Sequence, residues 1–393
     1  MQIKLLINLN ILRPALTGIG YYTKNIIKEC LKRNIELVGI KNGKLLDQQE
    51  IKELITSLED ISGVSPGSSL SFKQRSVELL RSFPGIYAIK YYLISVRAKK
   101  ILNSLAEQGF IYFEPSFVPM QYKGKIITTI HDLSFITHPE FHPVERVNFL
   151  TKMVKQSVAV SNHIVVDSNF IRSELMENYS IKESQLSTVY LGVEDKFRVY
   201  DQQEVAPILN KLNLKQNRFI LSVATLEPRK NLAKLVESYR ELSDELKVKY
   251  PLVLVGSSGW KNSALFDSIQ DLIENGNIIV TGYLSDIELN HIYSSAALFV
   301  YPSIYEGFGL PIIEAMASGT AVITSNCGAT AEVAGDFAFL VDPTNKKAIS
   351  EGIESILSDP NLRLSLEEKA ISRASSFTWG KCVDDLLSIA QKL

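Results

Sequence analysis

The chain has 393 residues, a formal net charge of −1 at pH 7, and a composition that is 46% hydrophobic and 22% charged. This length predicts two domains, and the composition excludes a largely disordered chain. No apolar run approaches the roughly 20 residues of a membrane helix, and Cys30, Cys327 and Cys382 lack the spacing of a disulfide framework or a zinc site. We therefore expect a soluble protein of the reducing cytoplasm.

In the first half of the chain, short apolar runs alternate with stretches of helical periodicity. The predicted strands lie at 3–9, 35–40, 125–130, 163–168 and 186–193. Such alternation predicts parallel strands covered by helices. A long, partly basic helical insertion at about 41–109 interrupts this rhythm and contains a glycine- and serine-rich loop at 62–69.

Positive charge is concentrated in this insertion. Residues 1–200 carry 25 basic and 19 acidic side chains, whereas residues 201–393 carry 17 and 24. Within 71–100, a single acid, Glu78, accompanies seven basic residues: Lys73, Arg75, Arg81, Lys90, Arg97, Lys99 and Lys100. A basic surface with aromatic residues can attract nucleic acid, phosphorylated ligands or an anionic membrane. An ordinary solvated helical face explains the same pattern equally well.

The second half repeats the alternation more regularly. The predicted strands lie at 218–224, 251–257, 277–283, 297–303, 320–326 and 337–343. Their nearly continuous apolar character is typical of strands buried on both faces. A polar stretch near 195–217 predicts a linker. We therefore expect a first domain at 1–195, a second at 196–375, and a terminal amphipathic helix at 376–393. The sequence does not fix the packing partner of this helix, and the first domain is one candidate. The predicted fold is α/β, with two doubly wound Rossmann-like domains facing each other across a cleft that binds ligands at the strands' carboxyl ends.

Two motifs of the first half fit this position. Gly18 and Gly20 open a predicted helix after the first strand, where backbone amides can approach a phosphate, although a tight turn without a ligand explains them as well. His131, beside Asp132, follows the strand at 125–130 and can orient a sugar hydroxyl, act as an acid or base, or bind a metal. No further metal ligands lie nearby in the sequence.

Two motifs of the second half carry charge. Arg229 and Lys230 precede a helix, where the macrodipole disfavours cations, so a bound anion such as a diphosphate is the simpler explanation. Glu306 lies on a glycine-rich loop after the strand at 297–303, and Glu314 is expected in the first turn of a helix that begins at Pro311. A first-turn acid is favourable without a ligand, but that explanation does not cover Glu306.

The run YEGFGLPIIEAMASGTAVITSN at 305–326, in which Glu306 and Glu314 form an E-x7-E pair, resembles the retaining glycosyltransferases of family 4, which have the GT-B fold. TGIGYYTKNI at 17–26, IHDLSFITHPEFHP at 130–143, ATLEPRKNL at 224–232 and GYLSDIEL at 282–289 occur in the expected order. The resemblance therefore extends over nearly the whole chain.

The resemblance implies roles for individual residues. Glu314 would bind the ribose of the donor nucleotide, Glu306 the transferred sugar, and Arg229 and Lys230 the diphosphate. His131 would reach the sugar at the breaking bond. The implied donor site comprises Gly18, Gly20, Arg229, Lys230, Tyr283, Leu284, Glu306, Gly307, Phe308, Gly309, Leu310 and Glu314, with Tyr283 and Leu284 beside the base. His131, Glu306, Arg229 and Lys230 would be catalytic, and no metal or other cofactor would be needed. Many relatives carry a further Arg near SVATLE, which this chain lacks, so charge neutralisation would depend more on Arg229 and Lys230.

The run at 131–143 is similar to bacterial mannosyltransferases and deoxyhexosyltransferases of O-antigen or capsule synthesis. This implies GDP-mannose as donor, a lipid-linked oligosaccharide as acceptor, and no nucleic-acid partner, with the basic 71–100 region at the cytoplasmic face of an anionic inner membrane. Three alternatives stay open. The protein could use another donor, such as a GDP-deoxyhexose or a UDP-sugar; it could be a sugar-nucleotide epimerase of the same fold; or it could be a two-lobed sugar-binding protein.

Overall fold

The computed structural model describes residues 2–13, 16–33, 35–61, 86–225, 227–256 and 263–393. The glycine- and serine-rich stretch at 62–69, together with Lys73, Arg75, Glu78 and Arg81, lies outside these residues. Contacts divide the chain into two units, one formed by 1–192 with 379–393 and the other by 193–378. Each unit is described by itself below.

The first unit is built on a seven-stranded sheet in the order β3-β2-β1-β4-β5-β6-β7, in which only β3 is antiparallel. Its strands are β1 (Lys4–Asn8), β2 (Glu36–Lys41), β3 (Lys44–Leu46), β4 (Ile111–Glu114), β5 (Ile126–Ile130), β6 (His163–Val166) and β7 (Leu186–Thr188). The chain starts in the middle at β1, proceeds to one edge, and returns to β4 on the other side of β1. The strand order therefore reverses between β1 and β4.

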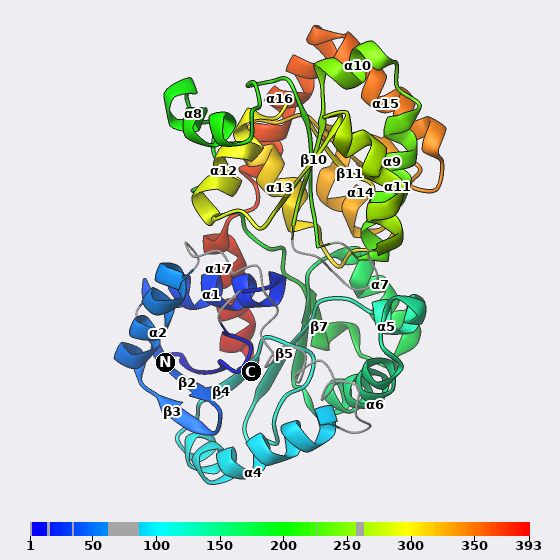
Figure 1. Ribbon diagram of the computed structural model, residues 1–393. Helices are drawn as coiled ribbons and strands as arrows, with labels where there is room; N and C mark the ends of the chain where they lie inside the picture. The colour runs from blue at the N-terminus through cyan, green and yellow to red at the C-terminus, as the bar shows by residue number, and fades with distance from the viewer. Residues whose placement is uncertain (1, 14–15, 34, 62–85, 226, 257–262) are drawn as a thin grey trace. The chain divides into compact units, whose positions relative to one another are not determined.

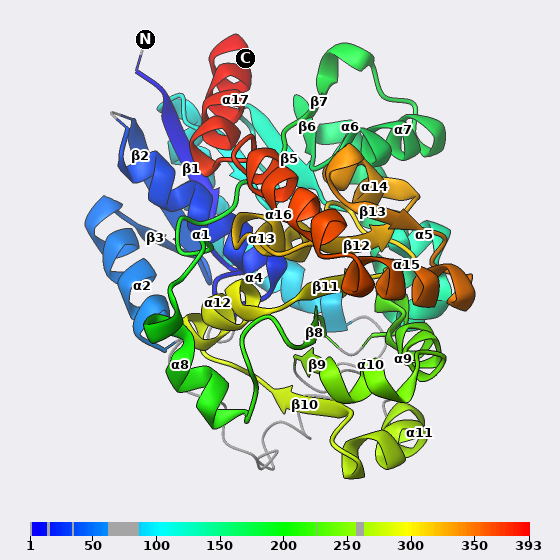
Figure 2. The same cartoon turned by 90° about the horizontal axis from the view of Figure 1, so that it is seen from above.

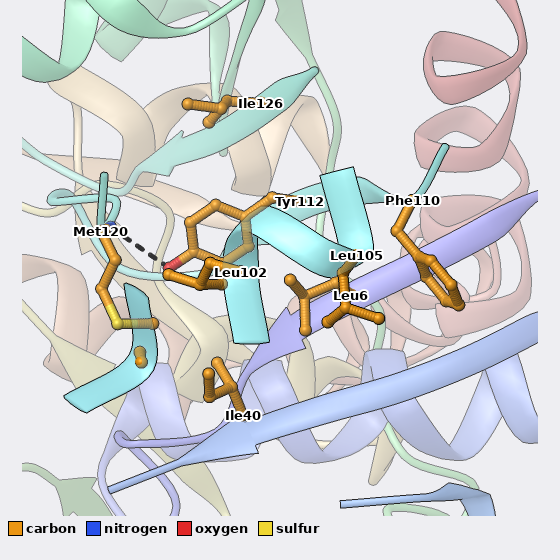
Figure 3. Close-up of a cluster of buried hydrophobic side chains, with 9 residues drawn as sticks. Leu6, Ile40, Leu102, Leu105, Phe110, Tyr112, Met120 and Ile126 are labelled. Atoms are coloured by element: carbon orange, nitrogen blue, oxygen red, sulfur yellow. Dashed lines mark hydrogen bonds between the residues drawn. The ribbon is translucent and has the colours of Figure 1, made fainter. Parts of the chain in front are cut away.

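Strands β3 and β4 are absent from the strands that the sequence predicts. β4 has four residues and directly follows the helical insertion, so its short aromatic run lacks a recognisable period. In the structure it pairs with both β1 and β5. Its Tyr112 is fully buried in a cluster with Leu6, Ile40 and Met120, and Met120 N donates to Tyr112 Oη at 3.3 Å (Figure 3).

Helices surround this sheet. They are α1 (Gly18–Leu31), α2 (Gln48–Ile61), α4 (Ile86–Glu107), α5 (Ser134–Thr137), α6 (Val144–Val160), α7 (Asn169–Asn178) and α17 (Trp379–Lys392). The C-terminal α17 lies beside α1 (Figure 1), because its buried residues recur at helical spacing and form one apolar face. Arg33, just after α1, donates to Gly380 O at 2.9 Å and to Asp384 Oδ1 at 2.8 Å.

The second unit contains a six-stranded, entirely parallel sheet in the order β10-β9-β8-β11-β12-β13. Its strands are β8 (Ile220–Val223), β9 (Leu252–Val255), β10 (Ile278–Gly282), β11 (Leu298–Tyr301), β12 (Val322–Ser325) and β13 (Phe339–Val341). All six strands predicted for this half are confirmed, and every residue of β9, β11 and β12 is buried. This is the order of a doubly wound nucleotide-binding fold, and it reverses between β8 and β11.

The helices of this unit are α8 (Gln202–Lys211), α9 (Leu232–Arg240), α10 (Asp244–Lys249), α11 (Ser263–Glu274), α12 (Asp286–Ser295), α13 (Leu310–Ala317), α14 (Gly328–Ala334), α15 (Lys346–Ser358) and α16 (Pro360–Ala374). α13 and α16 pack side by side (Figure 2). The expected linker includes α8, whose start is stabilised by a capping box of Asp201 and Glu204. Across the described part of the chain, no helix is both long and apolar enough to span a bilayer.

Candidate active site

The loops after β8 and β11 meet where the strand order of the second unit reverses. The 3-10 turn Pro228–Lys230 follows β8, and the loop at 302–309 follows β11. Ile304 N donates to Arg229 O at 2.9 Å, and Ser303 Oγ lies 2.9 Å from the same oxygen. Asn231, which has a left-handed backbone with φ of 60°, donates to Pro302 O at 3.0 Å. The two loops are thus joined into one rigid element at the position where such sheets bind ligands.

The carboxylate of Glu306 is the centre of this element. Only 7% of the residue is exposed, and four donors point at its oxygens. Lys230 Nζ, Ser303 Oγ and Tyr301 Oη donate to Oε1 at 2.6, 2.7 and 2.8 Å. Arg229 Nη1 donates to Oε2 at 3.0 Å. The structure therefore brings three of the four predicted catalytic residues, Glu306, Arg229 and Lys230, into direct contact.

The charges of this cluster determine its protonation. Burial by itself would raise the pKa of Glu306, but the charges of Lys230 and Arg229 and the hydrogen bonds from Lys230 and Ser303 lower the pKa to about 2. Glu306 is therefore fully ionised at neutral pH. A second acid, Glu227, accepts from Arg229 Nε at 2.9 Å. Two cations and two carboxylates thus balance each other before any ligand binds.

Glu314 has a different environment. α13 begins at Leu310 after Gly309, whose φ of 108° suits glycine, and Pro311 is the second helical residue. No acid lies in the first turn of α13, so the expectation that Glu314 lies there is wrong, and the helix dipole does not explain the residue. Tyr293 Oη of α12 donates to Glu314 Oε2 at 3.0 Å. Burial raises the pKa of Glu314 to about 7 despite this bond.

The other expected donor-site residues of this unit lie on neighbouring loops. Gly307 and Phe308 lie on the loop between Glu306 and α13, and the Phe308 ring packs edge-on against Phe377. Tyr283 is partly exposed and Leu284 is buried, both directly after β10. The Lys196–Asp286 ion pair, with an N–O distance of 2.9 Å, acts electrostatically on both Tyr283 and Glu314. Neither Lys196 nor Asp286 was predicted as a site residue, although Asp286 lies within the GYLSDIEL run at 282–289.

His131 lies in the first unit, directly after β5. Its imidazole is buried and engaged at both nitrogens: Nδ1 lies 2.6 Å from Asp167 Oδ2, and Nε2 lies 2.7 Å from Pro115 O. Burial opposes a charge on the ring, but Asp167 and the bond to Pro115 raise the pKa of His131 above its ordinary value. A direct contact between the imidazole and a sugar therefore requires that one of these two hydrogen bonds be released.

Glu114 is a buried acid that the sequence did not indicate. It ends β4 beside the end of β1, where the strand order of the first unit reverses. Asn8 Nδ2 and Tyr112 Oη donate to its Oε2 at 2.6 and 2.7 Å, and Ser116 N donates to Oε1 at 3.1 Å. Burial nevertheless raises the pKa of Glu114 to about 8. The sequence did not predict strand β4. Glu114 was therefore not recognised as a residue at the end of a strand, where sheets of this type bind ligands.

Gly18 and Gly20 are the first and third residues of α1, whose N-cap Thr17 makes no side-chain capping bond. A Cβ at Gly18 would meet no atom of the described residues within 4 Å, whereas one at Gly20 would lie 2.9 Å from Leu16 Cδ2. Packing within the described residues therefore requires glycine at position 20 more than at position 18. The first-turn amides of α1 are a suitable place for an anion.

The described residues contain no group of three or more His, Cys, Asp or Glu side chains placed to hold a metal ion. The remaining histidines make local contacts. His142 Nε2 lies 2.8 Å from Ser134 Oγ, His163 Nε2 lies 2.8 Å from Ser187 Oγ, and the His291 ring packs on Tyr200.

Comparison with known proteins identifies the chain's relatives. Residues 206–373 match the family described as glycosyl transferases group 1. The chain is 31% identical over 379 residues to the O-antigen chain mannosyltransferase B of Escherichia coli, covering 96% of each protein. It is 30% identical over 265 residues to the serotype-specific mannosyltransferase WbdA of E. coli, a match that covers 65% of this chain but only 32% of that longer protein.

The fold matches solved glycosyltransferases. The structure of Anabaena HepE in complex with UDP and glucose aligns over 100% of both chains, with a TM-score of 0.72 and 15% sequence identity. The GT-B fold expected from the sequence is therefore confirmed, as is the resemblance to glycosyltransferases.

The Glu306 cluster predicts a specific pH dependence of stability. Glu306→Gln removes the buried carboxylate that pairs with the buried Lys230 and the partly buried Arg229, so it should lower the free energy of unfolding at pH 7 by about 3–5 kcal/mol. Because the pKa of Glu306 is lowered to about 2 in the folded protein, the stabilising contribution is present above the unfolded-state pKa and is lost as the pH falls toward 2. The difference between the two proteins should therefore shrink from pH 4.5 to pH 2 in denaturant titrations.

Glu183→Gln is the matched control, because Glu183 forms an exposed ion pair with Arg172. It should change the free energy of unfolding by less than about 1 kcal/mol at any pH in this range. A difference for Glu306→Gln that stays constant from pH 7 to pH 2 would contradict the role of the buried charge.

Proposed function

Since the chain belongs to the group 1 glycosyltransferases, we propose that it transfers mannose from GDP-mannose to a lipid-linked glycan in O-antigen or capsule synthesis, with retention of configuration and without a metal ion. The observation that carries the proposal is the hydrogen-bonded Arg229–Lys230–Glu306 cluster at the strand-order reversal of the second unit. The choice of mannose is supported by the 31% identity, over almost the full length, to a protein named as an O-antigen chain mannosyltransferase.

In this proposal the second unit binds the donor. Arg229 and Lys230 hold the diphosphate, and the negative charge of the donor replaces part of the attraction that these cations have for Glu306 in the free protein. Glu314 accepts hydrogen bonds from the ribose hydroxyls, and the segment with Tyr283 and Leu284 borders the base. The backbone amides of Gly307, Phe308, Gly309 and Leu310, at the start of α13, approach the sugar and phosphate.

The first unit supplies the remaining groups. The amides of Gly18 and Gly20 at the start of α1 contact the phosphate, and none of the described residues would lie within 4 Å of a Cβ at Gly18. The acceptor binds to this unit. Residues 1–195 thus form the acceptor-binding domain and 196–375 the donor-binding domain, with the helix at 376–393 returning to the first domain.

The proposed reaction breaks the bond between the sugar C1 and the donor phosphate oxygen and forms a bond from C1 to an acceptor hydroxyl oxygen. The hydroxyl proton passes to the departing phosphate oxygen. Arg229 and Lys230 stabilise the charge that develops on the diphosphate, which is the role a metal ion has in other phosphate chemistry. Glu306 does not act as the nucleophile, because four donors already occupy its oxygens and its low pKa makes it a weak base.

The principal test is a donor panel. Purified protein is incubated with GDP-mannose and with other GDP- and UDP-sugars, with and without a polyprenyl-diphosphate-linked glycan, and the released nucleotide is measured. We expect GDP release from GDP-mannose that depends on the acceptor, persists in EDTA, and gives an α-linked product by NMR. Transfer from a UDP-sugar alone would overturn the donor assignment. An epimerised nucleotide sugar without any transfer would overturn the transferase proposal.

Glu314→Gln should stabilise the folded protein at alkaline pH and weaken its binding of GDP. Because its pKa is raised to about 7 in the folded protein, its favourable contribution is complete below the unfolded-state pKa and is lost as the pH rises through 7. Glu314→Gln avoids this loss, so it should raise the thermal unfolding midpoint at pH 8 and change it little at pH 4. The same variant should bind GDP at least tenfold more weakly in calorimetry, since about 1.4 kcal/mol corresponds to one such hydrogen bond.

The exposed Glu351→Gln serves as the control and should change neither quantity. A Glu314→Gln variant with unchanged GDP affinity would refute the ribose role. A gain in unfolding midpoint that is equal at pH 4 and pH 8 would refute the explanation by burial.

We also propose that α4 contacts the anionic cytoplasmic face of the inner membrane. Its Tyr92, Leu93 and Val96 are 66%, 50% and 52% exposed, and Lys99 and Lys100 follow them one helical turn later. Replacing Arg97, Lys99 and Lys100 with Gln should reduce co-sedimentation with phosphatidylserine-containing vesicles, by about 1 kcal/mol of binding free energy per cation. Neutralising the exposed Arg198, Lys211 and Lys347 of the second unit is the control. If both triple variants sediment equally, α4 is an ordinary solvated helix and the proposed membrane contact is wrong.

A further inference from the structure

A row of hydrogen bonds joins three neighbouring strand ends of the first unit. Asp167 follows β6, His131 follows β5, and Glu114 ends β4. Asp167 Oδ2 lies 2.6 Å from His131 Nδ1, and His131 Nε2 lies 2.7 Å from Pro115 O. Ser116 N donates to Glu114 Oε1 at 3.1 Å. Two buried carboxyl groups therefore lie at the two ends of one connected series.

The link between His131 and Glu114 is a single peptide group. Pro115 O and Ser116 N belong to the same peptide unit, which is planar, so fixing its N–H also fixes the direction of its C=O. Glu114 holds the N–H, and the carboxyl group of Glu114 is itself fixed by Asn8 and Tyr112. The carbonyl that faces His131 is thus oriented by a side chain that does not touch the imidazole.

This geometry selects one protonation state of His131. A neutral imidazole has one N–H donor, but both ring nitrogens of His131 face acceptors, a carboxylate and a carbonyl. Burial raises the pKa of Asp167, but the adjacent His131 opposes this effect. With Asp167 ionised, both hydrogen bonds form only when the ring is a charged imidazolium. The second oxygen of Asp167, Oδ1, is buried and has no hydrogen-bond partner within the described part of the chain, so the charge of Asp167 is stabilised mainly by His131.

We propose that Asp167 and Glu114 are positioning residues that keep both nitrogens of His131 protonated, Asp167 by direct contact and Glu114 through the Pro115–Ser116 peptide. The effect on the reaction rests on the proposed transferase function. A doubly protonated His131 is not a base, so in the proposed reaction it does not take up the acceptor proton.

The remaining titratable groups around His131 do not disturb this state. Tyr22 of α1 packs edge-on against the imidazole, and the charge of Asp167 contributes to raising the pKa of Cys382 of α17. Burial raises the pKa of both Tyr22 and Cys382 well above their ordinary values, so both stay neutral. Asp132, the residue after His131, adds a smaller electrostatic effect that also favours the imidazolium, while its Oδ1 accepts from Ser134.

The first experiment measures His131 directly in the intact protein by 15N NMR with labelled histidine, the resonances being assigned with His131→Gln. The chain has five histidines. We expect two protonated ring nitrogens at pH 7 in the wild-type protein. A neutral His131 at pH 7 would overturn the proposal without any variant.

Variants separate the two positioning residues. Asp167→Asn should lower the pKa of His131 by roughly one unit or more, since removal of an adjacent opposite charge has effects of this size. Glu114→Gln should lower it by less, because Glu114 acts on the ring only through the Pro115–Ser116 peptide. Asp132→Asn removes the same charge from a residue that makes no hydrogen bond to the ring, so it should change the pKa of His131 least. An Asp167→Asn shift no larger than that of Asp132→Asn, or no shift in Glu114→Gln, would overturn the corresponding role.

Activity gives an independent readout. Asp167→Asn should reduce kcat for mannose transfer about tenfold or more, leave KM for GDP-mannose within threefold, and move the alkaline limb of the pH–rate profile to lower pH, because the charged His131 is lost earlier as the pH rises. An unchanged profile would overturn the catalytic consequence. The NMR arm needs no donor, so it stands or fails separately from the donor panel that tests the proposed function.

Discussion

The buried carboxylate of Glu306 is the constraint on which the candidate site depends. A charged group with 7% exposure is stable only if it is paired and hydrogen-bonded, and Glu306 meets this requirement with Lys230, Arg229, Tyr301 and Ser303. Lys230, Arg229 and Ser303 lie on the loops that follow the adjacent strands β8 and β11, and Tyr301 is the last residue of β11. The same interaction therefore stabilises the loops and places two cations at the ligand-binding edge of the sheet.

The strand-order reversals of the two units each contain a buried acid, and their electrostatics differ. Glu306 is paired with two cations, so its pKa is lowered to about 2. Glu114 has only neutral donors around it, so burial prevails and its pKa rises to about 8. Glu314, with one neutral donor, rises to about 7. These three glutamates therefore behave differently according to the charge of their neighbours. Glu306 stays ionised at neutral pH, whereas Glu114 and Glu314 are weak acids.

His131 and Glu306 also differ in what remains available for a ligand. Both ring nitrogens of His131 and both oxygens of Glu306 are already engaged in the free protein. Neither residue is arranged as a free base or nucleophile, and this is consistent with chemistry that depends on positioning and on stabilisation of the departing diphosphate. The groups with exchangeable partners are the cations, whose attraction to Glu306 a bound diphosphate can share.

Local patterns were sufficient for most of the second sheet, because its strands are buried on both faces and read as continuous apolar runs. They failed at β4, which is too short to show a period, and with it they failed at Glu114. They also placed the start of α13 one residue late, because Pro311 was taken as its first residue, whereas the left-handed Gly309 lets the helix begin at Leu310. That single residue moves Glu314 out of the first turn and removes the helix dipole as its explanation.

The sequence by itself determined the α/β alternation, the order of the motifs, and the identity of the charged residues on strand-end loops, because these depend on neighbours within a few positions. Only the tertiary structure decided how those residues combine. Lys230 and Glu306 are 76 positions apart, and His131 and Asp167 are 36 apart, so their pairing follows from strand order and register rather than from local pattern. The tertiary structure also decided the protonation of these side chains, because burial and the charge of partners distant in sequence set each pKa.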